Sequence, residues 1–215
     1  LPFARQLGLD VPLITYDGAL VKAALSGRTY FCRPLPPELA AEVLKLFRHN
    51  NWHIQAYVDD VLYVRERDAA VKTYERIAGI QAVPVGDELW NLAGSPVKLL
   101  AIDKPETIRK IEASLAGKFG ERLYTAVSKP AYLEIVNCGV NKGRALAWLA
   151  GRLGLEREQV MAVGDSNNDL DMIEYAGLGV AMGNAAPAVK AAALVVTRGN
   201  DEDGVAEAIE RWALN

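Results

Sequence analysis

The sequence of 215 residues is poor in cysteine and histidine, with two of each. Cys32 and Cys138 lie far apart in the chain and fit no metal-binding or redox spacing, so we expect free thiols in a reducing compartment. No apolar run approaches the ~18 residues that a membrane-spanning helix needs, and the first residues lack the pattern of a signal peptide. These absences predict a soluble, cytoplasmic protein with no membrane partner.

The chain also lacks a strong charge of either sign. It carries 24 basic and 27 acidic residues, for a net charge of −3, so its composition predicts no nucleic-acid partner. Internal repeats and low-complexity tracts are absent. With 51% hydrophobic and 24% charged residues, the chain can bury an ordinary core as one large domain or two modest ones. Nothing in the sequence fixes an oligomeric state.

The section between about residues 25 and 130 has a mixed α+β texture. Amphipathic or capped patterns predict helices at 36–50, 67–78 and 105–119. Apolar stretches predict strands at 29–32, 53–58, 61–64, 96–102 and 123–128, with Asp59-Asp60 as a hairpin turn. Four aromatic residues fall in this section; we expect most of them in its core, and the alternative is that one or two line a pocket for a sugar: Trp52, Tyr57, Tyr63 and Trp90.

From about residue 132 onward, strands and helices alternate at short intervals. Strands are predicted at 132–136, 160–163, 178–182 and 194–197, and helices at 142–153, from 168, at 187–192 and at 204–212. Such alternation is typical of a parallel sheet with crossover helices. The short strand at 12–16 is expected in the same sheet as 160–163. We therefore predict an α/β core domain made of residues 1–24 and 131–215, split by an inserted α+β domain at 25–130.

The residues Gly-Asp-Ser-Asn-Asn-Asp at 164–169 carry the strongest chemical signal. An apolar run ends at Gly164, Asp165 follows at once, and a helical pattern begins soon after. Ligands of open α/β sheets bind outside the carboxyl ends of the strands. Carboxylates such as Asp165 and Asp169 suit a hard cation such as Mg²⁺ there. The alternative is that these residues only cap a helix, yet capping needs one such residue and the loop supplies five.

Lys142 opens a predicted helix that Asn141 can cap. A cation in the first turn faces the positive end of the helix dipole, which is unfavourable unless an anion lies nearby. A phosphate or an aspartate would resolve this conflict; otherwise Lys142 is an exposed surface lysine. We expect Lys142, Asp165, Asn168 and Asp169 to converge at the carboxyl end of the sheet.

Lys142 followed by Gly-Asp-Ser-Asn-Asn-Asp resembles the haloacid dehalogenase (HAD) superfamily, and more narrowly the Cof-type phosphatases with an inserted IIB cap. Further similar stretches are Pro-Leu-Ile-Thr-Tyr-Asp-Gly-Ala at 12–19, Gly-Val-Asn-Lys-Gly at 139–143 and Gly-Val-Ala-Met-Gly-Asn-Ala at 179–185. The resemblance implies a HAD-like Rossmannoid core and an enzyme, a Mg²⁺-dependent phosphatase acting on small phosphorylated metabolites such as sugar phosphates. It implies that Asp165 binds Mg²⁺, with Asp169 supporting the metal or its water shell. Lys142 would hold the phosphoryl group and the nucleophile, and Asn168 would contact the phosphate.

The chain departs from this family in one respect. The family's nucleophile lies in an Asp-x-Asp-Gly motif after its first core strand, and a Thr or Ser ligand follows its second strand; neither motif nor strand has a counterpart here. Asp201-Glu202-Asp203-Gly204 matches the nucleophile motif by its letters, but Arg198-Gly199-Asn200 separates it from its strand. The first strand is central in the family fold, so the slot beside strand 160–163 must be filled. We expect an omitted N-terminal segment; the alternatives are another chain or a rearranged strand. A second hypothesis is a truncated, non-catalytic relative that binds metal or a phospho-ligand.

Overall fold

The computed structural model describes residue 4 and residues 6–92 and 94–214. The chain folds as two compact units. Unit 1 contains the described residues up to Pro12 together with Lys22–Gly139, and unit 2 contains Leu13–Val21 and the described residues from Val140 onward. This division differs from the boundaries that the sequence predicts: the described residues up to Pro12, together with residues 22–24 and 131–139, belong to unit 1 and not to the unit of the parallel sheet.

Unit 1 is built on a six-stranded sheet with the order β6-β5-β4-β7-β9-β8. Its strands are β4 (Ile54–Val58), β5 (Val61–Val64), β6 (Ala82–Pro84), β7 (Lys98–Ile102), β8 (Leu123–Lys129) and β9 (Tyr132–Asn137). Neighbouring strands run antiparallel except β5 and β6. The predicted β4–β5 hairpin is confirmed: Asp59 and Asp60 at its turn have φ angles of 50° and 63°, as tight hairpin turns require.

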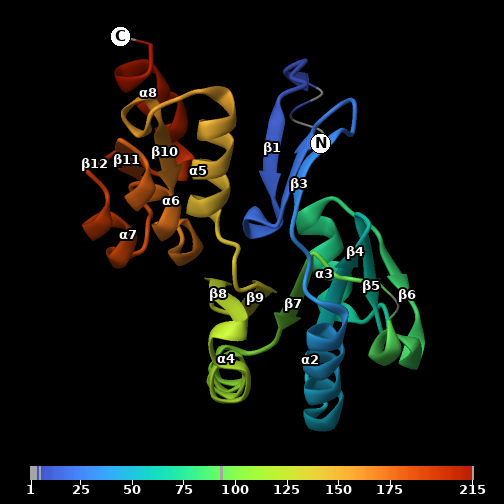
Figure 1. Cartoon of the computed structure of the whole chain (residues 1–215). Coiled ribbons are helices and arrows are strands. Elements are labelled where there is room, and N and C mark those ends of the chain that lie inside the picture. Colours follow the sequence, from blue (N-terminus) through green and yellow to red (C-terminus); the bar gives the residue numbers. More distant parts are fainter. Residues whose placement is uncertain (1–3, 5, 93, 215) are drawn as a thin grey trace. The chain divides into compact units, whose positions relative to one another are not determined.

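Two long helices cover one face of this sheet. They are α2 (Pro37–Asn50) and α4 (Pro105–Phe119), and the shorter α3 (Ala69–Ala78) also belongs to the unit (Figure 1). Leu44 and Phe47 of α2 and Ile111 of α4 pack in one buried cluster with residues that alternate along β4, β7 and β9. The apolar residues spaced at the helical period in α2 and α4 therefore pack in a single core with the apolar residues spaced two apart along the strands.

Unit 2 contains a parallel sheet in the order β10-β11-β12. The strands are β10 (Met161–Gly164), β11 (Leu178–Ala181) and β12 (Val195–Val196), and the helices are α5 (Lys142–Leu153), α6 (Leu170–Tyr175), α7 (Pro187–Ala192) and α8 (Gly204–Trp212) (Figure 1). A separate core joins Ala162 and Ala181 of the strands to Ile173 of α6 and Val189 of α7. The predicted alternation of strand and helix is confirmed, and the fold is α/β.

The placement of β9 corrects the sequence analysis. We expected residues 132–136 to belong to the parallel core, but Ile135 pairs antiparallel with Leu99 of β7 and with Thr125 of β8. The physical reason is local: only a short turn separates β8 from β9, and a short turn can join antiparallel but not parallel strands. β9 ends beside the start of α2, where Nδ2 of Asn137 donates to the carbonyl of Pro34 over 3.0 Å.

The expectation that residues 12–16 and 160–163 share a sheet is wrong. β1 (Pro12–Thr15) lies in a three-stranded sheet of order β1-β2-β3 with β2 (Leu20–Ala23) and β3 (Thr29–Cys32). The single turn η1 (Tyr16–Gly18) connects β1 to β2. β2, the nearest strand in sequence, therefore pairs with β1 and occupies the hydrogen-bonding edge of β1. Within the described part of unit 2, β10 pairs with β11 on one side only.

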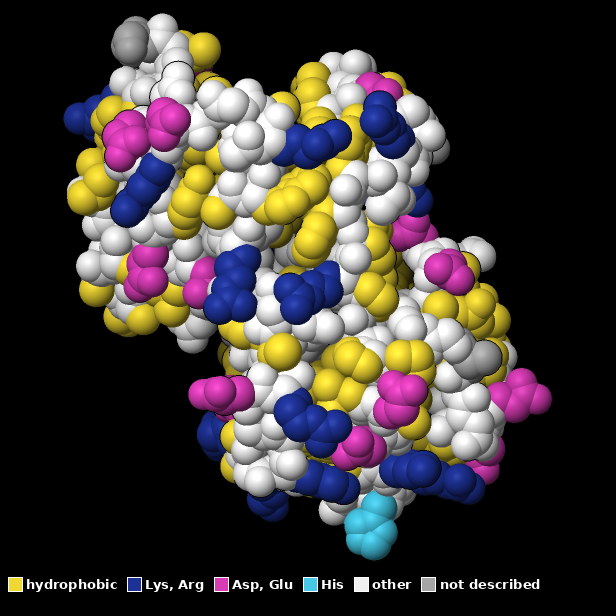
Figure 2. All heavy atoms as spheres, viewed as in Figure 1, with side chains coloured by type: hydrophobic (Ala, Val, Ile, Leu, Met, Phe, Trp, Pro, Cys, Tyr) yellow, Lys and Arg dark blue, Asp and Glu magenta, His cyan; other side chains and the backbone are white. Residues whose placement is uncertain are grey.

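The surface carries charges of both signs. On the face drawn in Figure 2, basic and acidic side chains are interspersed with apolar ones. Across the residues that the structure describes, no helix is long and apolar enough to cross a membrane.

Candidate functional site

The loop that follows β10 folds back on itself around Asp169. Ser166 and Asp169 form a capping box at the start of the turn η5 (Asn167–Asp169), and Oδ2 of Asp169 accepts hydrogen bonds from the backbone amides of Asp165 and Ser166, each over 3.0 Å. A Cβ atom at Gly164 would lie 2.6 Å from the Cβ of Asp169. The glycine before Asp165 is therefore needed for the close approach of Asp169.

Lys142 reaches the same loop from the first turn of α5. Its Nζ donates to Oδ1 of Asp169 over 2.6 Å, and the Asp169 side chain is 8% exposed. Asn141 caps α5 as predicted, because its Oδ1 accepts from the amide of Arg144 over 2.7 Å. A cation at a helix N-terminus is unfavourable unless an anion lies beside it, and the carboxylate of Asp169 is the anion beside Lys142.

Asp165 lies between two further side chains. Its Oδ1 accepts from Oγ of Ser166 over 2.9 Å and its Oδ2 accepts from Nδ2 of Asn184 over 3.1 Å. Asn184 follows β11, and its Oδ1 accepts from the amide of Asn200 after β12 over 2.9 Å. The ends of all three parallel strands are therefore linked to one carboxylate, which stays partly exposed to solvent.

Asn168 is buried on the inner side of the loop. Its Nδ2 donates to Oδ1 of Asp17 over 3.0 Å, and the two side chains belong to residues that are 6% and 9% exposed. Oδ1 of Asn168 is buried with no hydrogen-bond partner among the described residues. The structure thus brings Lys142, Asp165, Asn168 and Asp169 to loops that are joined by hydrogen bonds within unit 2.

Sequence reasoning missed Asp17 and Asn184. In the sequence, Asp17 and Asn184 were identified only as members of the similar stretches at 12–19 and 179–185. Asn184 lies shortly after the end of β11, so the rule that identified Asp165, applied to every parallel strand, points to this loop as well. Asp17 lies in the turn after β1, which is outside the parallel sheet, so the rule does not reach it.

The chemistry of these side chains fits Mg²⁺. Asp169 is buried and accepts three hydrogen bonds, whereas Asp165 is partly exposed and accepts two, so its carboxylate keeps lone pairs for a cation. Within residues 6–92 and 94–214, no group of three or more His, Cys, Asp or Glu side chains is arranged to hold a metal. Mg²⁺ needs no such cage, since it commonly binds through one or two carboxylates, substrate phosphate and water.

Residues 197–200 separate Asp201 from the end of β12, as the sequence indicated. It falls in the turn η6 (Asn200–Glu202) after β12, is exposed, and its Oδ1 accepts from Nδ2 of Asn200 over 3.2 Å. A nucleophile must be held in a fixed direction toward the atom it attacks. Asp201 is exposed, and a hydrogen bond from the neighbouring side chain of Asn200 does not fix its carboxylate in such a direction.

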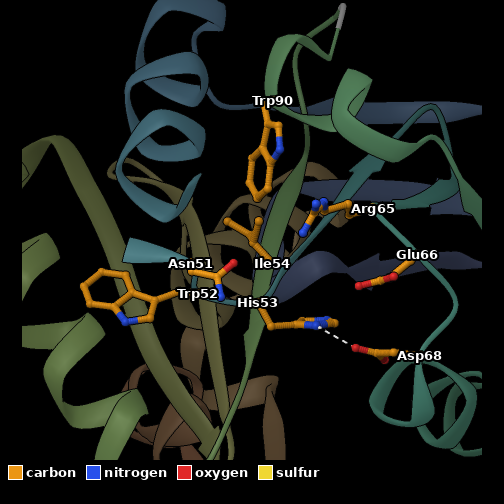
Figure 3. Close-up of a pocket in the computed structure, with 8 residues that line it drawn as sticks. All are labelled: Asn51, Trp52, His53, Ile54, Arg65, Glu66, Asp68 and Trp90. Carbon is orange, nitrogen blue, oxygen red and sulfur yellow. Dashed lines mark ion pairs between the residues drawn. The ribbon is translucent and has the colours of Figure 1, made fainter. Parts of the chain in front are cut away.

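Unit 1 contains a cavity of its own of about 190 Å³. Figure 3 shows Trp90, Ile54 and Arg65 on one side of it and His53 paired with Asp68 on the other. His53 Nδ1 lies 3.5 Å from Asp68 Oδ2; burial lowers the pKa of His53, and the nearby Asp68 and Asp103 oppose that shift. No residue predicted from the Gly-Asp-Ser-Asn-Asn-Asp loop or from Lys142 lines this cavity.

Comparison with known proteins gives one consistent result. A family model described as haloacid dehalogenase-like hydrolase matches residues 1–209. The 5-amino-6-(5-phospho-D-ribitylamino)uracil phosphatase YitU of Bacillus subtilis is 30% identical over 98% of this chain and 79% of its own length.

Solved structures agree with these sequence matches. A haloacid dehalogenase-like hydrolase from Bacteroides thetaiotaomicron is 32% identical with a TM-score of 0.86, over 98% of this chain and 80% of its own. A protein from Thermotoga maritima is 36% identical with a TM-score of 0.80, over 97% of this chain and 78% of its own.

Proposed function

We propose, from the premise that this chain belongs to the haloacid dehalogenase-like hydrolases of the Cof type, that it serves in the Mg²⁺-dependent hydrolysis of phosphate monoesters. The family membership makes it a HAD-type phosphatase by resemblance. The proposal adds the metal, the residues and the substrate class, which is small phosphorylated metabolites such as sugar phosphates. In this proposal unit 2 is the catalytic core and unit 1 the cap.

The observation that carries the proposal is the Lys142–Asp169 ion pair beside Asp165 at the carboxyl end of β10. Lys142 places a positive charge at the N-terminus of α5, where a phosphoryl group is favoured by charge and by the helix dipole. Asp169 fixes the lysine and the turn that presents Asp165. Asp165 is the proposed Mg²⁺ ligand, with Asp169 in support, and Asn168 contributes to binding the phosphorylated substrate.

Mg²⁺, when bound, would neutralise negative charge that develops on the phosphoryl oxygens. Hydrolysis through a covalent enzyme intermediate also needs a nucleophilic carboxylate positioned in line with the bond to be broken at phosphorus. Asp169 is held by three hydrogen bonds and Asp165 is assigned to the metal, so neither is free to attack. We therefore propose that the nucleophile comes from an Asp-x-Asp strand of the family type, which is not among the strands of the residues that the structure describes.

The substrate class rests on a relative. YitU carries the name of a phosphatase for a phosphorylated ribityl compound, which is a small metabolite with a polyol chain. The second candidate function, binding of metal or phospho-ligand without turnover, is favoured by the lack of an identified nucleophile among the described carboxylates.

The test compares the 215-residue chain with a version that carries an added Asp-x-Asp strand, using p-nitrophenyl phosphate with and without Mg²⁺. We expect background turnover from the first and Mg²⁺-dependent turnover from the second, which Asp165→Ala should abolish. Mg²⁺-dependent hydrolysis by the bare chain that Asp201→Asn removes would overturn this assignment. Phosphate binding without turnover in both versions would establish the binding function instead.

A further inference from the structure

The cavity of unit 1 has a histidine in its wall that contacts a fully buried amide. His53 lines the cavity together with Arg65, Glu66 and Asp68 (Figure 3). Nε2 of the His53 ring lies 3.2 Å from Nε2 of Gln55, and Gln55 is 0% exposed within β4. One nitrogen of this titratable ring therefore faces the protein interior.

The position of the hydrogen on the neutral His53 ring follows from its two neighbours. Nδ1 lies 3.5 Å from Oδ2 of Asp68, and an ionised carboxylate can only accept hydrogen bonds. Nδ1 therefore carries the hydrogen, and Nε2 is left with a lone pair. The amide of Gln55 must then turn its NH₂ group toward Nε2 and donate to it.

This orientation leaves the other end of the Gln55 amide without support. Its Oε1 is buried and accepts no hydrogen bond from any group that the structure describes, although buried polar atoms nearly always have a partner. A single hydrogen bond, that to His53, therefore holds the amide within the described part of the chain. A half-turn of the amide breaks only this bond, and it brings Oε1 to the position beside the ring.

Protonation of His53 makes this half-turn favourable. In the imidazolium both ring nitrogens are donors, so the NH₂ group of Gln55 would face a second donor at Nε2. After the half-turn, Oε1 of Gln55 accepts from Nε2 instead. Hydrogen bonds from a charged donor are roughly twice as strong as neutral ones, and Nδ1 keeps its hydrogen toward Asp68 in both states.

The charges around His53 act in both directions on its protonation. Burial lowers the pKa of His53, and carboxylates from three segments oppose that shift: Asp68 before α3, Asp103 before α4 and Glu66 after β5. Arg65 is the cation in the same wall, and its Nε donates to Oδ1 of Asp87 over 3.0 Å, which offsets part of its charge. We expect His53 to titrate below the ordinary histidine pKa of about 6.5.

We infer that His53 and Gln55 form a proton-operated switch in the wall of this cavity. A proton from solvent binds Nε2 of His53, the amide of Gln55 makes a half-turn, and the wall gains one positive charge. The neutral ring beside Asp68 becomes one member of an ion pair. The switch consists of unit 1 residues only, so it is independent of the proposed phosphatase site.

The first test is NMR of the full chain during a pH titration, over the range in which circular dichroism shows a folded protein. The chain contains two histidines, so His49→Gln leaves only the ring signals of His53. Loss of a signal in Gln55→Met identifies the NH₂ group of Gln55. Above the midpoint, ring ¹⁵N shifts should show hydrogen on Nδ1 alone, with NOEs from the NH₂ group to the ring; below it, these NOEs should disappear.

Three outcomes of this titration would overturn the switch. The first is hydrogen on Nε2 of the neutral ring, which contradicts the assigned direction of the hydrogen bond from Gln55. The second is a set of NOEs that persists below the midpoint, because the amide then does not turn. The third is a His53 ring that stays neutral until the protein unfolds.

The second test is the pKa of His53 in Gln55→Met, which keeps the length of the side chain and removes the amide. An amide that turns favours the imidazolium, so its removal should lower the pKa of His53 and weaken proton binding about tenfold. A fixed NH₂ group repels the imidazolium, so its removal would raise the pKa. An unchanged or raised pKa therefore contradicts the switch. Gln81→Met removes an exposed amide of unit 1 and, as the matched control, should leave the pKa of His53 unchanged.

Discussion

At the scale of single residues, the site depends on glycines that allow close contacts. Gly164 lies where a Cβ atom would be 2.6 Å from that of Asp169, while a Cβ at Gly151 in α5 would meet nothing within 4 Å. The two glycines make a matched pair in unit 2. One is required by the fold of the site, and the other is only a flexible position inside a helix.

We expect Gly164→Ala to destabilise unit 2 by about 1–3 kcal/mol, as overpacking typically does, and to loosen the loop that holds Asp169. Gly151→Ala should instead be neutral or stabilising by up to about 1 kcal/mol, because alanine favours a helix interior over glycine. Urea unfolding followed by hydrogen exchange in unit 2 measures both. Equal effects of the two substitutions would refute the packing argument.

The residue scale also shows how far the sequence predicts the site. The helix dipole predicted an anion beside Lys142, either a phosphate or an aspartate, and the structure pairs Lys142 with Asp169. Asp17 could not be assigned from sequence, because its partner Asn168 is remote in the chain and the contact depends on three consecutive positive φ angles, at residues 16–18. Local patterns predict a cap or a strand end, but not which loops come together.

At the scale of elements, helices were predicted more accurately than strands. The bounds of α4, α5, α7 and α8 agree with those expected, since caps, prolines and the helical period act locally. β2 and β6 were missed, and β1 and β9 were assigned to the wrong sheet. β6 has only three residues, Ala82–Pro84, and the helix α3 separates it in sequence from its partner strand β5. The sheet to which a strand belongs depends on partner strands that are distant in the sequence, which local patterns do not reveal.

Glu75 fastens α3 to this short strand. Its Oε1 accepts from the amide of Ala82 over 2.7 Å and its Oε2 from Arg67 over 2.8 Å. These hydrogen bonds, that from Arg67 first, lower the pKa of Glu75 below its ordinary value. A lowered carboxyl pKa adds stability above the unfolded-state pKa of about 4.3, and this stability is lost as the pH falls through the folded-state value.

Glu75→Gln should therefore lower the thermal midpoint of unit 1 at pH 7, and the difference from the wild type should shrink toward pH 3. Fluorescence of Trp52 and Trp90, both in unit 1, reports this transition in a background where the tryptophans of unit 2 are replaced. Glu66→Gln, an exposed carboxylate before α3, is the control. A difference that stays constant from pH 7 to pH 3 would contradict the assigned role.

At the scale of the whole molecule, each unit has its own hydrophobic core. The buried cluster of unit 1 joins α2, α4 and the six-stranded sheet, and that of unit 2 joins β10 and β11 to α6 and α7. Separate cores allow separate unfolding transitions. A ligand that binds only the folded form of one unit then stabilises that unit by mass action.

Because the proposed site lies within unit 2, Mg²⁺ with inorganic phosphate should protect the amides of unit 2 against hydrogen exchange. At 100 times the dissociation constant the stabilisation is about 2.7 kcal/mol, and unit 1 should change little. Ca²⁺, which takes more ligands than Mg²⁺ and tolerates a less regular coordination geometry, is the comparison ion. Equal protection of both units by Mg²⁺ and phosphate would place the binding elsewhere.

The hydrogen bond from Asn137 to the carbonyl of Pro34 has a consequence for how such a protein can diversify. It brings together the two ends of a stretch that includes every residue of the unit 1 core cluster, from Leu35 to Ile135. If genes of two relatives recombine near the positions of Pro34 and Asn137, the segment between them is exchanged with its core intact. The two new junctions then lie next to each other in the folded protein. Asp17, Lys142 and the loop after β10 lie outside the exchanged segment, so new variants of unit 1 can arise without rewriting the residues of the site.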